Sequence, residues 1–242
     1  MDVTIHALDA PALLHTVTFF RWTYAGSLYI LPGMLTRNPD KTRRALLEAA
    51  FDEIRVHGFQ AASLSNILAK TDVTKGALYH HFPDKKKLGY AVVDEILDEI
   101  IRAKWIEPLQ QGDPIDAMMQ TLNAEGCAIA NEKVFVGCPL NNLAQEVSNL
   151  DAGFRRRIAR LFTLWRQAIS AALARGQTEG VVRAGVDTDA AATFIVAAIE
   201  GCLGMAKSAN DIGLLHECGA GLMHYLETLR LNPSAAKERT RS

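Results

Sequence analysis

The residues best suited to chemistry lie between positions 63 and 85, and they suit hydrogen bonding to a nucleic acid. Thr74, Lys75, Gly76 and Ala77 are small or polar and begin a predicted short helix. A helix with such a start can approach base edges in the major groove, where Lys75 can reach a guanine edge or a phosphate and Ala77 can touch a thymine methyl group. The run therefore predicts a base-reading surface.

Groups that can bind phosphate flank this surface. A serine at a helix start offers amide donors and a favourable dipole to an anion, while tyrosine and lysine side chains can bind backbone oxygens. A histidine adds one more polar contact. The candidates are Ser63, Tyr79, His80 and Lys85. The alternative is a small helical subdomain packed only for stability, which leaves the exposed polar run unexplained.

Cys138 is a second candidate for chemistry. In Gly137-Cys138-Pro139 the proline suits the first position of a helix, which makes Cys138 the N-cap. A thiol at this place gains from the helix dipole, so we expect a lowered pKa and a raised reactivity. The alternative is a half-buried cap with a structural role only.

We predict no catalytic residues, no metal site and no cofactor. No motif places a Ser-His-Asp or Cys-His arrangement, and His216, Cys218 and His224 lack the spacing of metal ligands. The four cysteines have apolar neighbours and scattered positions. They predict reduced thiols in a cytoplasmic core rather than a disulfide scaffold.

The elements that must position these residues are helices. Long segments rich in Ala, Leu, Ile, Glu and Arg, without sustained β-type alternation, predict an all-α protein. Ser63 and Thr74 suit helix N-caps, and Gly58 suits a helix end. The arginines at 155–157 and 160 are expected on a solvated face. The predicted helices span 41–57, 64–70, 75–80, 85–106, 115–131, 139–147, 151–179, 188–209 and 212–231.

Charge is distributed unevenly along the 242 residues, although the net charge is only -1. Residues 36–90 hold ten Lys/Arg against six Asp/Glu, whereas residues 91–242 hold fifteen against nineteen. A basic end on an acidic body suits a protein that binds a polyanion through one end.

Four parts are predicted along the chain: a 1–35 extension, a 36–84 helix-turn-helix DNA-binding domain, an 85–232 helical domain, and a disordered 233–242 tail. The first 35 residues allow three interpretations. They form a disordered or loosely docked extension, they precede a natural start at Met34, or they anchor the chain to a membrane. The uninterrupted apolar part from Trp22 is too short to span a bilayer, which disfavours the third.

The segment from about Thr42 to Ala91 resembles the DNA-binding domain of the tetracycline-repressor (TetR, AcrR-type) family of bacterial transcription regulators. The matching strings are A-L-L-E-A-A-F, G-F, S-L-S-N-I, V-T-K-G-A-L-Y-H-H-F and K-K-K-L. The resemblance implies an N-terminal three-helix domain that holds a helix-turn-helix, followed by a C-terminal helical domain. The residues that match DNA-contacting positions are Ser63, Ser65, Thr74, Lys75, Gly76, Ala77, Tyr79, His80 and Lys85.

Two positions depart from the family pattern. The turn reads Thr71-Asp72-Val73 instead of Ala-Gly-Val, and Leu68 replaces a customary alanine. The family glycine suggests a left-handed conformation, which aspartate tolerates better than most residues. We therefore expect Asp72 to adopt it at some cost.

In the 85–232 domain, called the body below, the resemblance implies a homodimer interface and a ligand pocket. Small residues among apolar ones in 188–209 and 212–231 support a four-helix dimer interface, with a tight intrachain core as the alternative. A hydrophobic or aromatic small molecule suits the pocket. The candidate pocket residues are Trp105, Met118, Met119, Leu122, Phe135, Cys138, Asn142, Phe162, Trp165 and Met205. The sequence GCPLNNLAQEVS also resembles a subgroup with an oxidant- or electrophile-sensing cysteine, in which Lys207 matches a nearby lysine.

The resemblance implies a cytoplasmic, ligand-responsive homodimeric repressor that binds a palindromic double-stranded DNA operator and responds to an unidentified small-molecule inducer. An activator stays open. The alternatives are a repressor switched by oxidants or electrophiles through Cys138, a small helical enzyme, and a membrane-associated interaction protein that uses the first 35 residues.

Overall fold

The computed structural model describes residues 39–131 and 135–231, and over these ranges the protein is built of helices. The only extended pairing within them is an isolated bridge between Val182 and Arg230. The all-α prediction is confirmed. The extension predicted at 1–35 and the tail predicted at 233–242 lie outside the described residues.

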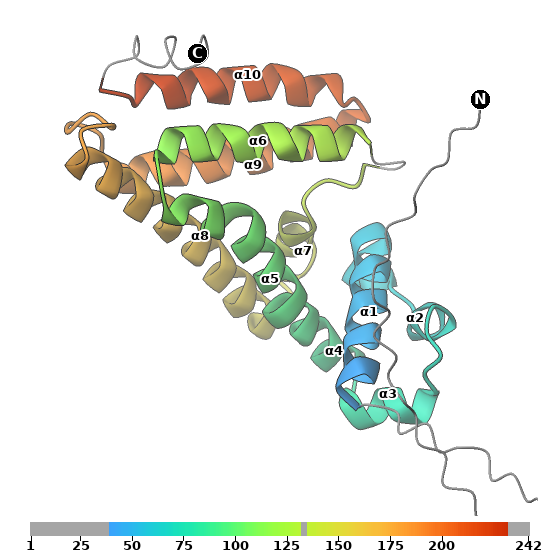
Figure 1. Ribbon diagram of the computed structural model, residues 1–242. Helices are drawn as coiled ribbons and strands as arrows, with labels where there is room; N and C mark the ends of the chain where they lie inside the picture. Colours follow the sequence, from blue (N-terminus) through green and yellow to red (C-terminus); the bar gives the residue numbers. More distant parts are fainter. Residues whose placement is uncertain (1–38, 132–134, 232–242) are drawn as a thin grey trace, which may run out of the picture. The chain divides into compact units, whose positions relative to one another are not determined.

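Three helices make up the N-terminal part (Figure 1): α1 (Pro39–Ala61), α2 (Leu64–Ala69) and α3 (Lys75–His81). Helix α1 buries an apolar stripe that includes Leu46, Leu47 and Ala50, which explains why α2 and α3 fold against it. The backbone of α1 kinks at Gly58, where φ is 79°. A positive φ favours glycine, so the predicted helix end at this residue is a real break.

The predicted caps are observed. The Ser63 hydroxyl accepts the Asn66 amide at the start of α2, and the Thr74 hydroxyl accepts the Ala77 amide at the start of α3. Each bond satisfies one of the amides that a helix start leaves without a partner. Sequence-local chemistry thus fixes where both short helices begin.

Residues 85–106 form one continuous helical segment, as predicted, although its hydrogen bonding alternates between α and π types. It consists of α4 (Lys85–Ala91), η1 (Val92–Leu97), α5 (Asp98–Ile101) and η2 (Arg102–Ile106), and the 3-10 turn η3 (Glu107–Gln110) follows. Backbone angles stay in the right-handed helical region across each junction.

The remaining helices are α6 (Pro114–Ala130), α7 (Pro139–Val147), α8 (Ala152–Thr178), α9 (Thr188–Ala209) and α10 (Gly213–Thr228). Helix α9 packs against α8 and α10, and α10 also lies beside α6 (Figure 1). Within the described ranges, α9 alone is long and apolar enough to span a membrane. A core helix meets the same criterion, and α9 packs against α8 and α10 as a core helix does.

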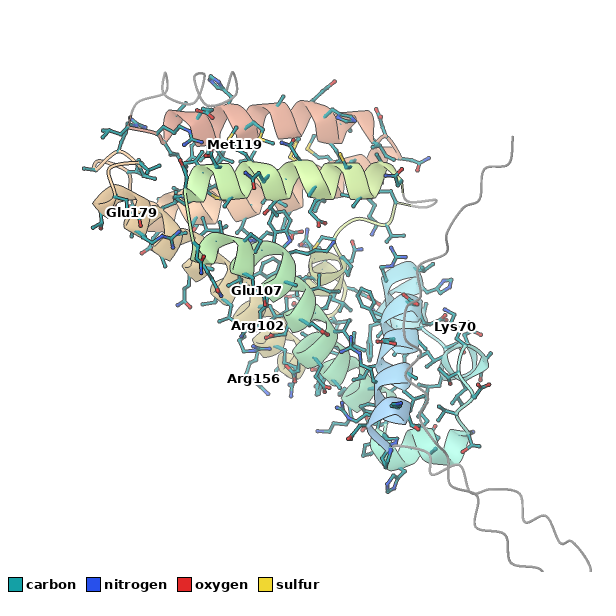
Figure 2. All side chains as sticks on the ribbon, in the orientation of Figure 1. Lys70, Arg102, Glu107, Met119, Arg156 and Glu179 are labelled. Atoms are coloured by element: carbon teal, nitrogen blue, oxygen red, sulfur yellow. A yellow bond between two sulfur atoms is a disulfide. The ribbon has the colours of Figure 1, made fainter. Side chains whose placement is uncertain are left out.

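Ion pairs join α8 to the 85–106 segment, which corrects one prediction. Arg157 Nε lies 2.7 Å from Asp94 Oδ2, and Arg160 Nη1 lies 2.7 Å from Asp98 Oδ1. Arg156 is exposed on α8 (Figure 2). The arginine run is therefore only partly a solvated face, because every third or fourth residue turns toward the neighbouring helix.

A disulfide between Cys202 and Cys218 joins α9 to α10. The prediction that all four cysteines are reduced thiols is wrong for this pair. The two cysteines are 16 positions apart in the sequence. The helix-helix connection lies between them, and an antiparallel pair of helices brings the two positions together. Cys127 and Cys138 are free.

Candidate nucleic-acid interface and ligand cavity

The start of α3 carries an exposed polar face. Thr74, Lys75 and Gly76 are exposed and Ala77 is partly exposed, while Leu78 on the opposite side is only 1% exposed. A Cβ atom added to Gly76 would meet nothing within 4 Å. The helix is therefore anchored by apolar residues on one side and leaves small or polar groups free for a ligand on the other.

The other predicted nucleic-acid contacts differ in their surroundings. Tyr79, His80 and Ser65 are exposed, and Ser63 is half-buried at its capping position. Lys85 behaves differently: its ammonium donates to the Gln60 carbonyl at 2.8 Å. In this arrangement Lys85 holds the chain before α2, so a phosphate contact would require this bond to open.

A buried acid that the sequence analysis missed organises α2. Glu53 of α1 is 2% exposed and accepts hydrogen bonds from the Ser63 amide, the Asn66 side chain and the Lys70 ammonium. Lys70 lies just beyond the last residue of α2 (Figure 2). The hydrogen bond from Asn66 is the largest of several contacts that lower the pKa of Glu53 against its burial. The carboxylate therefore fixes α2 on α1.

The turn before α3 does not have the expected conformation. Outside glycine, Asn210 is the only residue with positive φ in the part of the chain that the structure describes. Asp72 thus completes the turn without the left-handed conformation, and the expected strain is absent. A negative φ suits any L-residue, which removes the need for the family glycine.

A second acid outside the predictions joins α7 to α1. The Glu146 carboxylate accepts the amides of Phe59 at 2.8 Å and Gln60 at 2.7 Å, just after the kink at Gly58. A Cβ atom at Gly58 would lie 2.8 Å from a Glu146 oxygen. The close approach of a carboxylate to two neighbouring amides thus depends on glycine at this position.

A cavity of about 390 Å³ is lined by residues of α1, the 85–106 segment, α6, α8 and α9, and by residues around the start of α7. Four of the predicted pocket residues line it: Trp105, Phe135, Cys138 and Trp165. The rings of Trp105 and Trp165 lie 4.8 Å apart. Aromatic walls with a few polar groups are typical of a small-molecule site.

A second cavity, of about 370 Å³, lies between α6, α9 and α10. Leu122 lines this space together with both cysteines of the disulfide, Cys202 and Cys218. Trp105 and Leu203 line both cavities. The two spaces therefore adjoin.

Five predicted pocket residues lie off both cavities. Met118 is buried in the core, where it lines a much smaller space, and Met119 on α6 (Figure 2) and Phe162 pack against the core from partly buried positions. Met205 is 56% exposed. Asn142 accepts the Lys207 ammonium at 2.8 Å and donates to the Val136 carbonyl. It holds the loop before α7.

Cys138 is the N-cap of α7, as predicted, but its thiol is not activated. Burial is the main cause that raises its pKa well above the usual range, and the neighbouring Glu200 carboxylate adds to the effect. The predicted lowering is therefore wrong, because desolvation of a thiolate outweighs the dipole of this short helix. Lys207 donates to Asn142 instead. The alternative of a switch through Cys138 is not favoured.

Glu200 of α9 is the third acid that the sequence analysis missed. It lines the first cavity, is 7% exposed, and neither of its oxygens has a hydrogen-bond partner among the described residues. Burial raises its pKa to about 7. The signal was present, because Glu200 follows Val196 by four residues and so falls on the buried stripe of α9.

Two family models match the chain. Residues 46–92 match that of the bacterial regulatory proteins of the tetR family, and residues 116–218 match that of the tetracyclin repressor-like C-terminal domain. The chain belongs to the TetR family. It is a DNA-binding transcriptional regulator, and the matched ranges contain α2, α3 and most of the body.

The regulator is 29% identical over 180 residues to an HTH-type transcriptional regulator in the lacX 3′ region of Lactococcus lactis, covering 74% of this chain and 89% of that protein. It is 25% identical over 177 residues to the HTH-type transcriptional repressor DhaR of Mycobacterium sp. strain GP1, covering 70% and 83%. A TetR regulator structure from Chloroflexus aurantiacus matches with a TM-score of 0.72 and 26% identity, covering 81% of this chain and all of the other.

No group of three or more His, Cys, Asp or Glu side chains among the described residues is arranged to hold a metal ion.

Proposed function

We propose that the regulator is a cytoplasmic homodimeric repressor that binds a palindromic operator and leaves it when a small molecule enters the body. Family membership supports DNA binding and ligand response, and one relative named above is called a repressor. The observation that carries the proposal is the exposed start of α3, held in place by buried Leu78 and Phe82. Small and polar groups at this position suit base readout in the major groove.

The outer face of α9 and α10 supports the homodimer. Phe194 is 52% and Met205 is 56% exposed on α9. Cβ atoms added at Gly201 and Gly221 would meet nothing within 4 Å. Exposed apolar groups beside small residues allow helices of a second copy to approach closely. A two-fold pair would present two copies of α3 to the two halves of a palindrome.

Helix α7 provides the proposed link between ligand and DNA. Its N-terminal cap, Cys138, lines the first cavity, and Glu146 in its last turn accepts two amides of the last turn of α1, after the kink at Gly58. Phe51 and Arg55 of α1 also line that cavity. A ligand that moves α7 or the segment beginning with α4 would change the position of α3, and hence the affinity for the operator.

DNA binding can be tested with the full chain and the DNA upstream of its own coding sequence, by fluorescence anisotropy at several salt concentrations. We expect sequence-preferring binding that weakens steeply with salt. Lys75→Ala should weaken it about tenfold or more, since a base contact contributes about 1–3 kcal/mol.

Arg156→Ala removes an exposed positive charge from α8 and is the matched control, with little change expected. Equal binding by Lys75→Ala and the wild type would contradict the proposed role of α3. Absence of binding even at low salt would contradict operator recognition at that DNA.

A further inference from the structure

Two residues that line the same cavity carry buried polar atoms that are not satisfied by ordinary hydrogen bonds. Trp165 Nε1 has no hydrogen-bond partner among the described residues, and the Glu200 oxygens have only the weak thiol donor of Cys138 beside them. The two side chains are 1% and 7% exposed, respectively. Both line the cavity of about 390 Å³. Unpaired polar groups are costly inside a protein, so their presence on a cavity wall points to a ligand that satisfies them.

Among the described side chains that line the cavity, no basic group pairs with Glu200. Three acidic and two basic side chains line it, and Lys104 already lies 2.8 Å from Glu125. Arg55, across the cavity on α1, makes no hydrogen bond to Glu200. Lys207, on the same helix as Glu200, donates to Asn142. The remaining lining charge, Asp52, is also negative.

Aromatic rings complete the environment that a cation requires. Trp105 and Trp165 stand 4.8 Å apart with an interplanar angle of 37°, and Phe51 and Phe135 also line the cavity. The faces of indole rings attract cations, most strongly where water is excluded. A cation with an apolar body would therefore meet an acid and aromatic faces together.

We propose that this cavity binds a hydrophobic organic cation, with its cationic head beside Glu200 and its apolar body against Trp105 and Trp165. The identity of this ligand as the inducer rests on the function proposed above, whereas its binding does not. A neutral ligand that accepts hydrogen bonds from Trp165 and from a protonated Glu200 is the competing possibility.

The pH dependence of binding separates these two ligands. Burial raises the pKa of Glu200 to about 7, and a permanently charged cation binds the ionised form. Its affinity should therefore rise about tenfold between pH 6 and pH 8, as the ionised fraction grows. A neutral acceptor that needs the protonated acid should show the opposite trend. The other titratable groups that line the cavity are Asp52, Arg55, Lys104, Glu125 and Cys138.

The test uses benzyltrimethylammonium and its neutral carbon isostere, neopentylbenzene, with the purified full chain at pH 6, 7 and 8. Binding is followed by calorimetry and by tryptophan fluorescence. At pH 8 we expect the cation to bind at least tenfold more tightly than the isostere. Glu200→Gln should remove this preference and its pH dependence while isostere binding is retained. Glu179→Gln, at the far end of α8, is the matched control.

Three outcomes would overturn the proposal: equal affinity for the two compounds, an unchanged cation affinity in Glu200→Gln, or no binding of the cation at millimolar concentration. Thermal unfolding of the Gln variant establishes that it is folded. Operator binding is measured in parallel. Glu200-dependent cation binding without operator release would contradict induction alone, and operator release without dependence on Glu200 would contradict the ligand class alone.

Discussion

Three glutamates at packed positions differ in how their charge is stabilised. Glu53 accepts three hydrogen bonds from the chain around α2, and Glu146 accepts two backbone amides after the kink in α1. Glu200 receives none from the described residues. The first two therefore serve the architecture, whereas the third lacks a donor of comparable strength among the described residues.

Glu200 should make stability depend on pH. Its pKa is raised from 4.5 to about 7, so between these values the folded protein holds a proton that the unfolded chain has released. The free energy of unfolding therefore falls as pH rises through this window, by about 3 kcal/mol in total. In Glu200→Gln this loss should be absent. Urea unfolding at pH 5 and pH 8 measures it.

Comparing how steeply the free energy of unfolding falls with pH in the wild type and in Glu200→Gln separates Glu200 from other groups that titrate in the same range. Glu179→Gln, which alters an acid at the end of α8, should keep the wild-type slope. If Glu200→Gln also kept that slope, the carboxyl would not be held protonated by burial.

Helix α7 contacts both the wall of the first cavity and the N-terminal helix α1. It is only nine residues long and packs against both α1 and α8. Its N-cap, Cys138, lies at the cavity wall, and Glu146 near its C-terminal end accepts two amides of the last turn of α1. Short rigid elements with distinct contacts at each end are suited to transmit a displacement.

Glu146→Gln should loosen the last turn of α1, which follows the kink at Gly58. A glutamine offers one carbonyl oxygen to two amides and places its own NH₂ group beside donors, so at least one charge-assisted hydrogen bond is lost. We expect amide hydrogen exchange at Phe59 and Gln60 to be at least tenfold faster, and ligand-induced release of the operator to be weaker. Gln145→Ala, one residue away and exposed, should change neither.

Unchanged amide hydrogen exchange at Phe59 and Gln60 in Glu146→Gln would show that the carboxylate does not hold the last turn of α1. A faster exchange with a full ligand response would instead place the coupling in the 85–106 segment.

The disulfide between α9 and α10 should stabilise the body. Closing a loop of this length restricts the unfolded chain, with an effect of about 3 kcal/mol. A reductant should therefore lower the midpoint of thermal unfolding. A double variant, Cys202→Ser with Cys218→Ser, should unfold at the lower temperature with or without reductant. Equal midpoints for the oxidised and reduced wild type would contradict this contribution.

At the scale of the whole molecule, the outer face of α9 and α10 decides whether two copies associate. Ala197 is exposed in the middle of this face. Ala197→Glu would bury an unpaired charge in each half of a dimer, and an uncompensated buried charge costs about 3–5 kcal/mol. We expect the dimer to dissociate at least 100-fold more readily and operator binding to weaken with it.

Light scattering after size exclusion measures the mass of the Ala197→Glu variant. Gln167→Glu introduces a charge at an exposed site on α8 and is the control. A dimer that persists in Ala197→Glu would place the interface elsewhere.

The sequence predicts the helices well because their signals are local. Ser63, Thr74 and Cys138 cap the helices expected of them, and the predicted bounds differ from the observed ones by a few residues. The long-range contacts are a different matter. Glu146 meets the Phe59 amide across 87 residues, and nothing in either local pattern specifies that pair.

For the candidate site, residue type indicates the cavity wall only in part. Trp105 and Trp165 line it as expected, whereas Met205 is exposed. An apolar residue on a helix serves a core, a cavity or an interface equally well, and only packing distinguishes them. The thiol of Cys138 was misjudged for a related reason, because burial cannot be read from its position as a cap.

Trp105 lines both cavities, so its indole ring forms part of the wall that separates them. Side chains move between discrete rotamers without any change of backbone. One such rotation would join the two spaces into a single longer chamber. Leu203, Glu125 and Ile129 line both spaces as well. The rotamer of Trp105 would then be one of several features that limit the size of the molecule the regulator accepts, and a smaller residue at position 105 should raise that limit.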